Sequence, residues 1–133
     1  MTTQLRGIAW NHVRGTAPMK AATMDFQGAR PDVAIHWEVR SLKDFEDYPI
    51  EPSAENCDLI LMDHPFVGTG AEKRVLVALD ELLPAGYMAD QRENSVDPSY
   101  DSYTWEGHQW ALAVDAAPNR AIGVFFPHKS AFA

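Results

Sequence analysis

The order of apolar segments in the first half of the chain constrains its fold more than any other feature. Residues 5–10, LRGIAW, predict a short strand, and residues 33–40 alternate between apolar and polar side chains, which is the period of a strand. Residues 57–63 are almost continuously apolar, as expected for a central parallel strand covered on both faces. Helical patterns separate these strands, over residues 16–29 and from residue 41 onward. This βαβαβ order predicts an α/β fold, with a parallel sheet and flanking helices.

The first predicted helix has a capping residue and an apolar face. Thr16 is expected to cap its N-terminus, because a side-chain oxygen at that position accepts a hydrogen bond from a free backbone N–H. Apolar side chains then recur at spacings of three, four and three residues, which places them on one stripe of the helix. We expect this stripe to face the sheet: Met19, Ala22, Phe26 and Ala29.

Polar and aromatic side chains follow two of the predicted strands. Trp10, Asn11 and His12 come directly after the first strand, and Asp63 and His64 end the third. Ligands of open α/β sheets bind beyond the carboxyl ends of the strands. These side chains are therefore the first candidates for a binding site.

The second half of the chain is less regular. Residues 103–114 predict a hairpin that turns at Glu106 and Gly107. All 19 acidic residues lie at or before Asp115, so the segment that follows differs in composition from the rest.

This difference suggests a boundary. We expect residues 1–115 to form an N-terminal lobe and residues 116–133 to be an atypical tail, which arises either from a changed reading frame or from the start of a crossing to another lobe. Within the tail, residues 121–126 are apolar and uncharged, and we expect them to be exposed and prone to aggregation.

Composition excludes several classes of protein. The net charge is −8 and no cluster of Lys or Arg exists, which argues against a nucleic-acid partner. Cys57 is the single cysteine, so an internal disulfide and a thiolate metal cage are excluded. No uncharged apolar run approaches the roughly 20 residues of a membrane helix. Nucleophile elbows and phosphate-binding glycine loops are absent from the sequence, and we expect neither an enzyme nor a cofactor.

Four segments resemble the N-terminal part of bacterial extracellular solute-binding proteins, the carbohydrate type that serves ABC transporters. LRGIAWNHVRG is similar to the first strand and its ligand-side loop, and CDLILMDHPFVG to the third strand. VLVALDELLP resembles the short segment that follows, and SYTWEGHQWALAVDAA the hairpin that leads toward the second lobe. In that hairpin Ala113 stands where the family usually has proline. The resemblance covers roughly residues 5–115.

The resemblance implies a periplasmic-binding-protein-like lobe that is truncated before the second lobe. It implies a small-molecule ligand, a sugar, and an ABC permease as the partner of a full-length protein. It also implies an extracytoplasmic location, whereas the N-terminus has no apolar stretch of a secretory signal, so the chain as written is expected in the cytoplasm.

By this resemblance a sugar would be held by aromatic stacking and hydrogen bonds at the strand ends. The expected ligand-binding residues are Trp10, Asn11, His12, Arg14, Asp63, His64, Phe66, Trp110 and Asp115. Each also has a plainer interpretation, as a core aromatic or a solvated loop residue. Of Trp105 and Trp110, which flank the hairpin turn, at least one is expected only to pack across strands.

Two alternative functions stay open from the sequence. An Asp–His pair can act with a metal in hydrolysis, so Asp63 and His64 allow a small α/β metal-dependent hydrolase. The apolar tail allows a truncated remnant that self-associates through faces that a missing lobe would cover.

Overall fold

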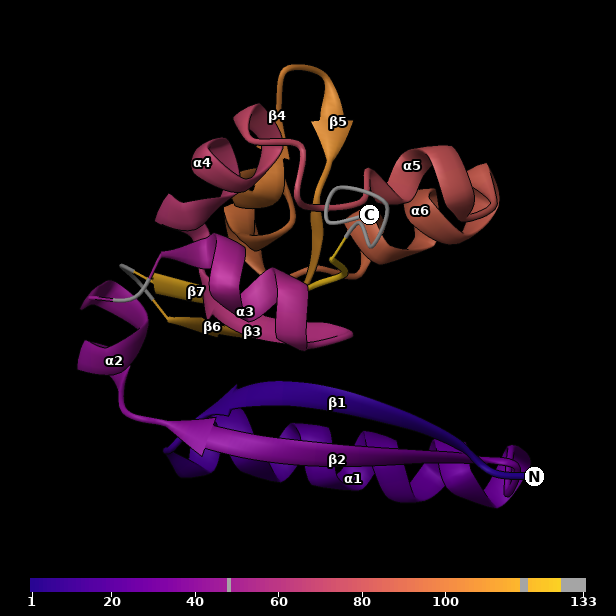
Figure 1. Cartoon of the computed structure of the whole chain (residues 1–133). Coiled ribbons are helices and arrows are strands. Elements are labelled where there is room, and N and C mark those ends of the chain that lie inside the picture. Colours follow the sequence, from indigo (N-terminus) through magenta and orange to yellow (C-terminus); the bar gives the residue numbers. More distant parts are fainter. Residues whose placement is uncertain (48, 118–119, 128–133) are drawn as a thin grey trace.

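The computed structural model describes residues 1–47, 49–117 and 120–127. Its helices and strands follow one another in the βαβαβ order for the first 63 residues, and shorter elements come after them (Figure 1). The elements are β1 (Thr3–Trp10), α1 (Val13–Ala29), β2 (Val33–Arg40), α2 (Leu42–Asp47), α3 (Ile50–Asn56), β3 (Leu59–Asp63), α4 (Val67–Glu72), α5 (Leu79–Leu82), α6 (Ala85–Glu93), β4 (Thr104–Trp105), β5 (His108–Gln109), β6 (Ala111–Ala117) and β7 (Arg120–Phe125), with single 3₁₀ turns η1 (His64–Phe66), η2 (Asp97–Ser99) and η3 (Asp101–Tyr103).

The main sheet has five strands in the order β2-β1-β3-β7-β6. Strand β1 pairs in parallel with β2 and β3, which confirms the predicted βαβαβ unit. Strand β7 is antiparallel to both β3 and β6, so the sheet is mixed rather than wholly parallel. A separate two-stranded ribbon, β4 and β5, carries the predicted turn at Glu106 and Gly107, both of which have a positive φ angle.

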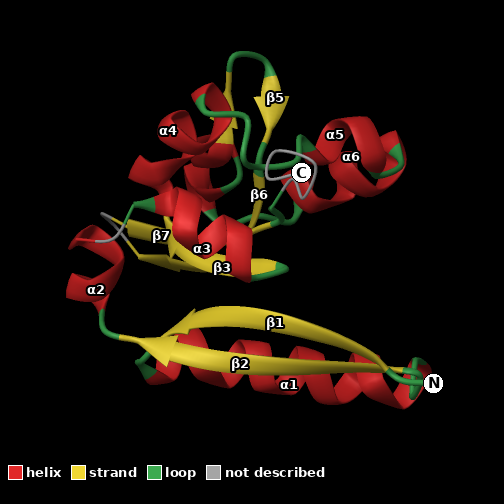
Figure 2. Cartoon of the chain, in the orientation of Figure 1, coloured by secondary structure: helices red, strands yellow, loops and turns green. Residues whose placement is uncertain are grey.

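Helices cover both faces of the sheet (Figure 2). Helix α1 packs over one face, where the buried residues are Ala9, Met19, Leu61 and Val124. Helices α3 and α4 and the segment around Tyr103 cover the other face, in a larger cluster that includes Ile8, Ile60, Tyr103 and Phe125. Strand β3 lies in the middle of these layers, and its Ile60 and Leu61 are fully buried, as its unbroken apolar run predicts.

Helix α1 differs from its prediction in both start and phase. It begins at Val13, and its N-cap is His12, whose Nδ1 accepts from the Arg14 N–H at 3.2 Å, so Thr16 is not the cap. Met19 is buried, but Phe26 of the predicted stripe is 39% exposed.

Two contacts explain the phase of this helix. The Trp37 indole N–H donates to the Thr23 hydroxyl at 2.9 Å, which turns Thr23 toward β2. A side chain at Gly15 would come within 2.8 Å of the Trp10 carbonyl oxygen, so only glycine allows the helix to lie this close to β1. These polar and steric contacts override the weak apolar pattern.

The segment after Asp115 is part of the sheet. Residues 120–125 form β7, and Gly123, Val124 and Phe125 are buried, so the expectation that residues 121–126 are exposed is wrong for residues 123–125. The expected tail also includes residues 118, 119 and 128–133, which lie outside the described residues.

Among the described residues, no helix combines the length and the apolar character needed to cross a bilayer.

The contact between β7 and Tyr103 generates a stability prediction. A Cβ atom at Gly123 would lie 2.6 Å from the ring of Tyr103, which is fully buried and meets Phe125 edge-on at 5.5 Å. Gly123→Ala should therefore destabilise the fold by about 1–3 kcal/mol, as overpacking of a closed core does. Urea unfolding measures the change.

Gly28→Ala is the matched control, because it adds the same methyl group in α1 where nothing lies within 4 Å. It should stabilise the protein by roughly 0.5–1 kcal/mol through helix propensity. Equal effects of the two substitutions would contradict the placement of β7 against Tyr103.

Candidate functional site

Four strands of the main sheet end at the same edge. Strands β1, β2 and β3 are parallel, and β6 runs in the same direction as β3 because β7 is antiparallel to both. Trp10, Arg40 and Asp63 are the last residues of the first three, and Asp115 lies near the end of β6. This carboxyl edge is where ligands of such sheets bind.

Trp10 and His12 form a stacked pair at this edge. Their ring centroids are 4.3 Å apart and their planes differ by 12°. Between them, the Asn11 N–H donates to the Arg40 carbonyl at 2.7 Å, which fixes the turn and leaves the Asn11 side chain exposed. The sequence therefore places an aromatic surface and a free amide side by side.

The ion pair of Arg14 and Asp115 joins α1 to β6. The Arg14 guanidinium donates a hydrogen bond to an Asp115 carboxylate oxygen, although the two residues are 101 positions apart. Asp115 follows a bulge-like register shift between Ala113 and Asp115 in the β6–β7 ladder. A bulge re-aims the side chains near it. Two residues chosen separately from the sequence thus meet at the carboxyl edge.

Asp63 lies close to the same group. In the sheet, Asp63 of β3 and Asp115 of β6 are both register partners of Ile122 in β7, one from each side. Burial raises the pKa of the Tyr103 hydroxyl above its ordinary value, and the negative charges of Asp63 and Asp115 raise it further. The edge therefore carries two carboxylates near one buried phenol.

The remaining predicted site residues lie elsewhere or are used in packing. Phe66 and Trp110 pack against the larger core cluster, and the partly buried Trp10 of the carboxyl edge packs against both clusters. The Trp110 indole N–H donates to the Trp105 carbonyl at 3.0 Å, and its ring meets His108 edge-on. Trp110 is thus the packing tryptophan of the hairpin, and its role toward a ligand stays a prediction.

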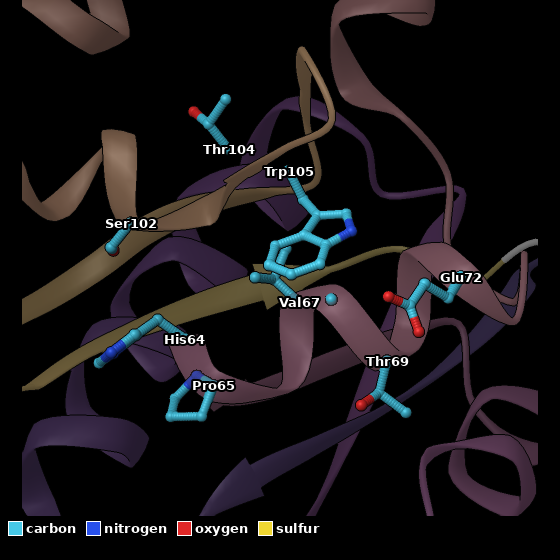
Figure 3. A pocket seen from close by; sticks show the side chains of 9 residues that line it. His64, Pro65, Val67, Thr69, Glu72, Ser102, Thr104 and Trp105 are labelled. Atoms are coloured by element: carbon cyan, nitrogen blue, oxygen red, sulfur yellow. The ribbon is translucent and has the colours of Figure 1, made fainter.

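A pocket of about 430 Å³ lies between α4 and the β4–β5 ribbon (Figure 3). His64 is the only predicted site residue among those that line it: His64, Pro65, Val67, Gly68, Thr69, Glu72, Ser102, Thr104 and Trp105. Sequence reasoning missed Glu72, and it left Trp105 open as either a stacking or a packing residue without including it among the expected ligand-binding residues. Their meeting depends on how the ribbon folds onto α4, which no local pattern encodes; the one available signal is Gly68, whose missing side chain leaves room for the Trp105 ring.

Within the described part of the chain, no three His, Cys, Asp or Glu side chains are grouped so that they could hold a metal ion. A hydrolase built on Asp63 and His64 stays a hypothesis from the sequence.

Comparison with known proteins extends this description. No protein-family model matches the sequence, and no curated protein matches it. Solved structures do match. The maltodextrin-binding protein MalE1 of L. casei BL23 superposes with a TM-score of 0.63 at 16% identity, over 85% of this chain and 29% of its own.

An ABC transporter solute-binding protein of Agrobacterium vitis S4 with bound D-mannitol gives a TM-score of 0.64 at 16% identity, over 84% of this chain and 27% of its own. The chain has the fold of part of an ABC solute-binding protein. The GacH receptor of Streptomyces glaucescens, solved without ligand and with acarbose, agrees with a TM-score of 0.64 at 15% identity. The fold expected from the sequence resemblance is confirmed.

The chain spans less than a third of the solved proteins that it matches, 27% and 29% of the first two. The match therefore concerns one part of a larger architecture.

The ribbon that carries Trp105 is held to α5 by Asp80. One Asp80 carboxylate oxygen contacts the His108 Nδ1 at 2.9 Å, and the other accepts from the Gln109 N–H at 2.8 Å. Burial opposes ionisation of Asp80, but the Gln109 N–H and His108 together hold its pKa below the ordinary value. The hydrogen bond and charge of Asp80 raise the pKa of His108.

These shifts predict how stability changes with pH. The lowered pKa of Asp80 stabilises the fold above its ordinary value of 3.8, and this contribution is lost as the pH falls. The raised pKa of His108 stabilises the fold below its ordinary value of 6.5, and this contribution is lost as the pH rises through the folded-state pKa. The pair thus contributes fully only between these two values.

We expect the free energy of unfolding to fall between pH 5.5 and pH 8.5, and to fall less in His108→Gln. Asp80→Asn should reduce the same difference, because it removes the partner that raises the pKa of His108. Urea unfolding at both pH values measures it. If both variants lose as much free energy of unfolding between pH 5.5 and pH 8.5 as the wild-type protein does, the ion pair does not couple the ribbon to α5.

Proposed function

We propose that this chain forms the sugar-contacting part of a carbohydrate-binding protein that serves ABC-type uptake. The observation that carries the proposal is the group of Trp10, Asn11, His12, Arg14, Asp63 and Asp115 at the carboxyl edge of a solute-binding-protein fold. In this function the chain binds and releases its ligand without chemical change.

Each side chain has a role that suits a sugar. The aromatic pair of Trp10 and His12 offers a flat apolar surface for the C–H face of a ring. The exposed Asn11 amide both donates and accepts hydrogen bonds, which matches hydroxyl groups. Asp63 and Asp115 accept from hydroxyls, and Arg14 orients Asp115 through their ion pair.

The matched structures support this class of ligand. One of them is a maltodextrin-binding protein, and others were solved with D-mannitol, maltotetraose or acarbose, which are all rich in hydroxyl groups. In the full protein that we propose, a second lobe closes over this edge, the partner is an ABC permease, and the site works outside the cytoplasm.

Self-association is a second candidate role, favoured by one observation. Met24 of α1 and Val39 of the edge strand β2 are large apolar side chains that stay exposed and line the same groove between the two elements. Such a surface can pair two copies of the chain. Light scattering that gives the mass of a monomer at high protein concentration would exclude it.

Titration with saccharides tests the main proposal. The four tryptophans give an intrinsic fluorescence signal, and the probes are maltose, maltotetraose and D-mannitol. We expect Asn11→Ala and Asp63→Ala to weaken binding roughly tenfold, since a hydrogen bond to a charged group contributes about 1.5–3 kcal/mol and a neutral one about 1.

The matched control is Asp25→Ala, which removes an exposed carboxylate on α1. Urea unfolding of each variant separates lost binding from lost folding. Saccharide affinity that stays unchanged in both site variants would show that the ligand does not lie at this edge.

A further inference from the structure

We propose that the pocket between α4 and the β4–β5 ribbon binds a second sugar ring, stacked on Trp105, so that the ligand is an oligosaccharide. This inference rests on the proposed function, which it extends beyond the strand ends. Three features of the pocket carry it: an exposed aromatic face, a wall of hydrogen-bond acceptors, and a lining residue, His64, that directly follows Asp63 of the carboxyl edge.

Trp105 supplies the stacking surface. Its side chain lies above α4 in the middle of the pocket, with His64 and Pro65 on one side and Glu72 and Thr69 on the other (Figure 3). The ring rests on Gly68, where a Cβ atom would lie only 3.1 Å from it. Trp105 is nevertheless 38% exposed. Gly68 therefore supports one side of the indole ring, and the exposed part of the ring is accessible to a ligand.

The polar wall of the pocket is made of acceptors. The Ser102 hydroxyl donates to the Ser99 carbonyl at 2.7 Å, so its proton is engaged. The Thr104 hydroxyl donates to Gln109 Oε1 at 2.7 Å. The orientation of the Gln109 amide is fixed, because its nitrogen donates to the Tyr100 and Ala111 carbonyls. Both hydroxyl oxygens can therefore only accept.

Glu72 adds an exposed carboxylate to this wall and makes no ion pair with any residue that the structure describes. A ligand that fits must donate several hydrogen bonds, as a sugar does, whereas phosphate and carboxylate ligands bring only further acceptors. The chain as a whole carries a charge of −8, which also disfavours an anion.

His64 connects the pocket to the carboxyl edge. His64 lines the pocket together with Pro65, which follows it in the turn after β3. His64 directly follows Asp63, the last residue of β3. A saccharide bound at Asp63 can thus continue past His64 to Trp105. The volume of about 430 Å³ is in the usual range for a small-molecule site.

The test is a titration followed by NMR of the tryptophan indole N–H signals. Trp105→Phe assigns the Trp105 signal, and the probes are glucose, which has a single ring, and maltose and maltotetraose, which have more. We expect the longer sugars to move the Trp105 signal and to bind roughly tenfold more tightly than glucose. Trp105→Ala and Glu72→Gln should remove this gain and leave glucose affinity unchanged. The control is Tyr87→Ala, an exposed aromatic on α6 outside the pocket.

The outcomes separate this inference from the proposed function. If the wild-type protein binds these sugars but the Trp105 signal does not move, or if Trp105→Ala keeps the gain with chain length, the second subsite is wrong and the strand-edge function stands. If the long sugar moves Trp105 while Asn11→Ala and Asp63→Ala have no effect, the pocket stands and the strand-edge assignment is wrong. If none of the sugars binds the wild-type protein, both are wrong.

Discussion

Strand β7 lies between β3 and β6 and runs antiparallel to both, and the carboxyl edge depends on this placement. Because β7 is antiparallel to both of its neighbours, β6 runs in the same direction as β3. Asp115 of β6 therefore lies at the same edge as Trp10 and Asp63. The position is held by packing: Phe125 and Tyr103 are both fully buried, and Gly123 lets the Tyr103 ring approach the strand. Because β6 pairs only with β7 in this sheet, Asp115 depends on β7 for its position beside Arg14.

The second region, around Trp105, depends on a different anchor. A two-residue turn with positive φ at Glu106 and Gly107 closes the β4–β5 ribbon, and Asp80 ties the ribbon to α5 through a side chain and a backbone N–H. On its other side the ribbon rests its tryptophan on Gly68 of α4. The hydrogen bonds of Asp80 and the absence of a side chain at Gly68 therefore position the ribbon that forms the pocket. Apolar packing of Phe125 and Tyr103, in contrast, positions the strands of the carboxyl edge.

The parts of this fold that could be predicted are those with a strong local pattern. The alternation over β2, the unbroken apolar run of β3 and the Glu106–Gly107 turn each depend on neighbouring residues only, and each is found where the pattern places it. The phase of α1 could not be predicted in this way, because the contacts of Thr23 with Trp37 and of Gly15 with Trp10 join separate elements. The same holds for the site. The ends of the predicted strands identified Trp10 and Asp63 as candidates. The contact of Gly68 with Trp105 could not be predicted, because it forms only when the β4–β5 ribbon packs onto α4.

The distribution of charge gives both regions a common chemistry. Arg14 and Arg40 are the arginines at the carboxyl edge, and each is paired with a carboxylate, Arg14 with Asp115 and Arg40 with Glu38. Asp63 lies close to Asp115, and Glu72 faces the pocket beyond His64. An anionic ligand would meet carboxylates at both places with no free cation from among these residues to compensate. A polyhydroxylated ligand, in contrast, donates to every one of these oxygens and carries apolar faces for Trp10 and Trp105. Under the proposed function, one neutral, extended molecule would satisfy both regions, and the two sites would be parts of one binding surface.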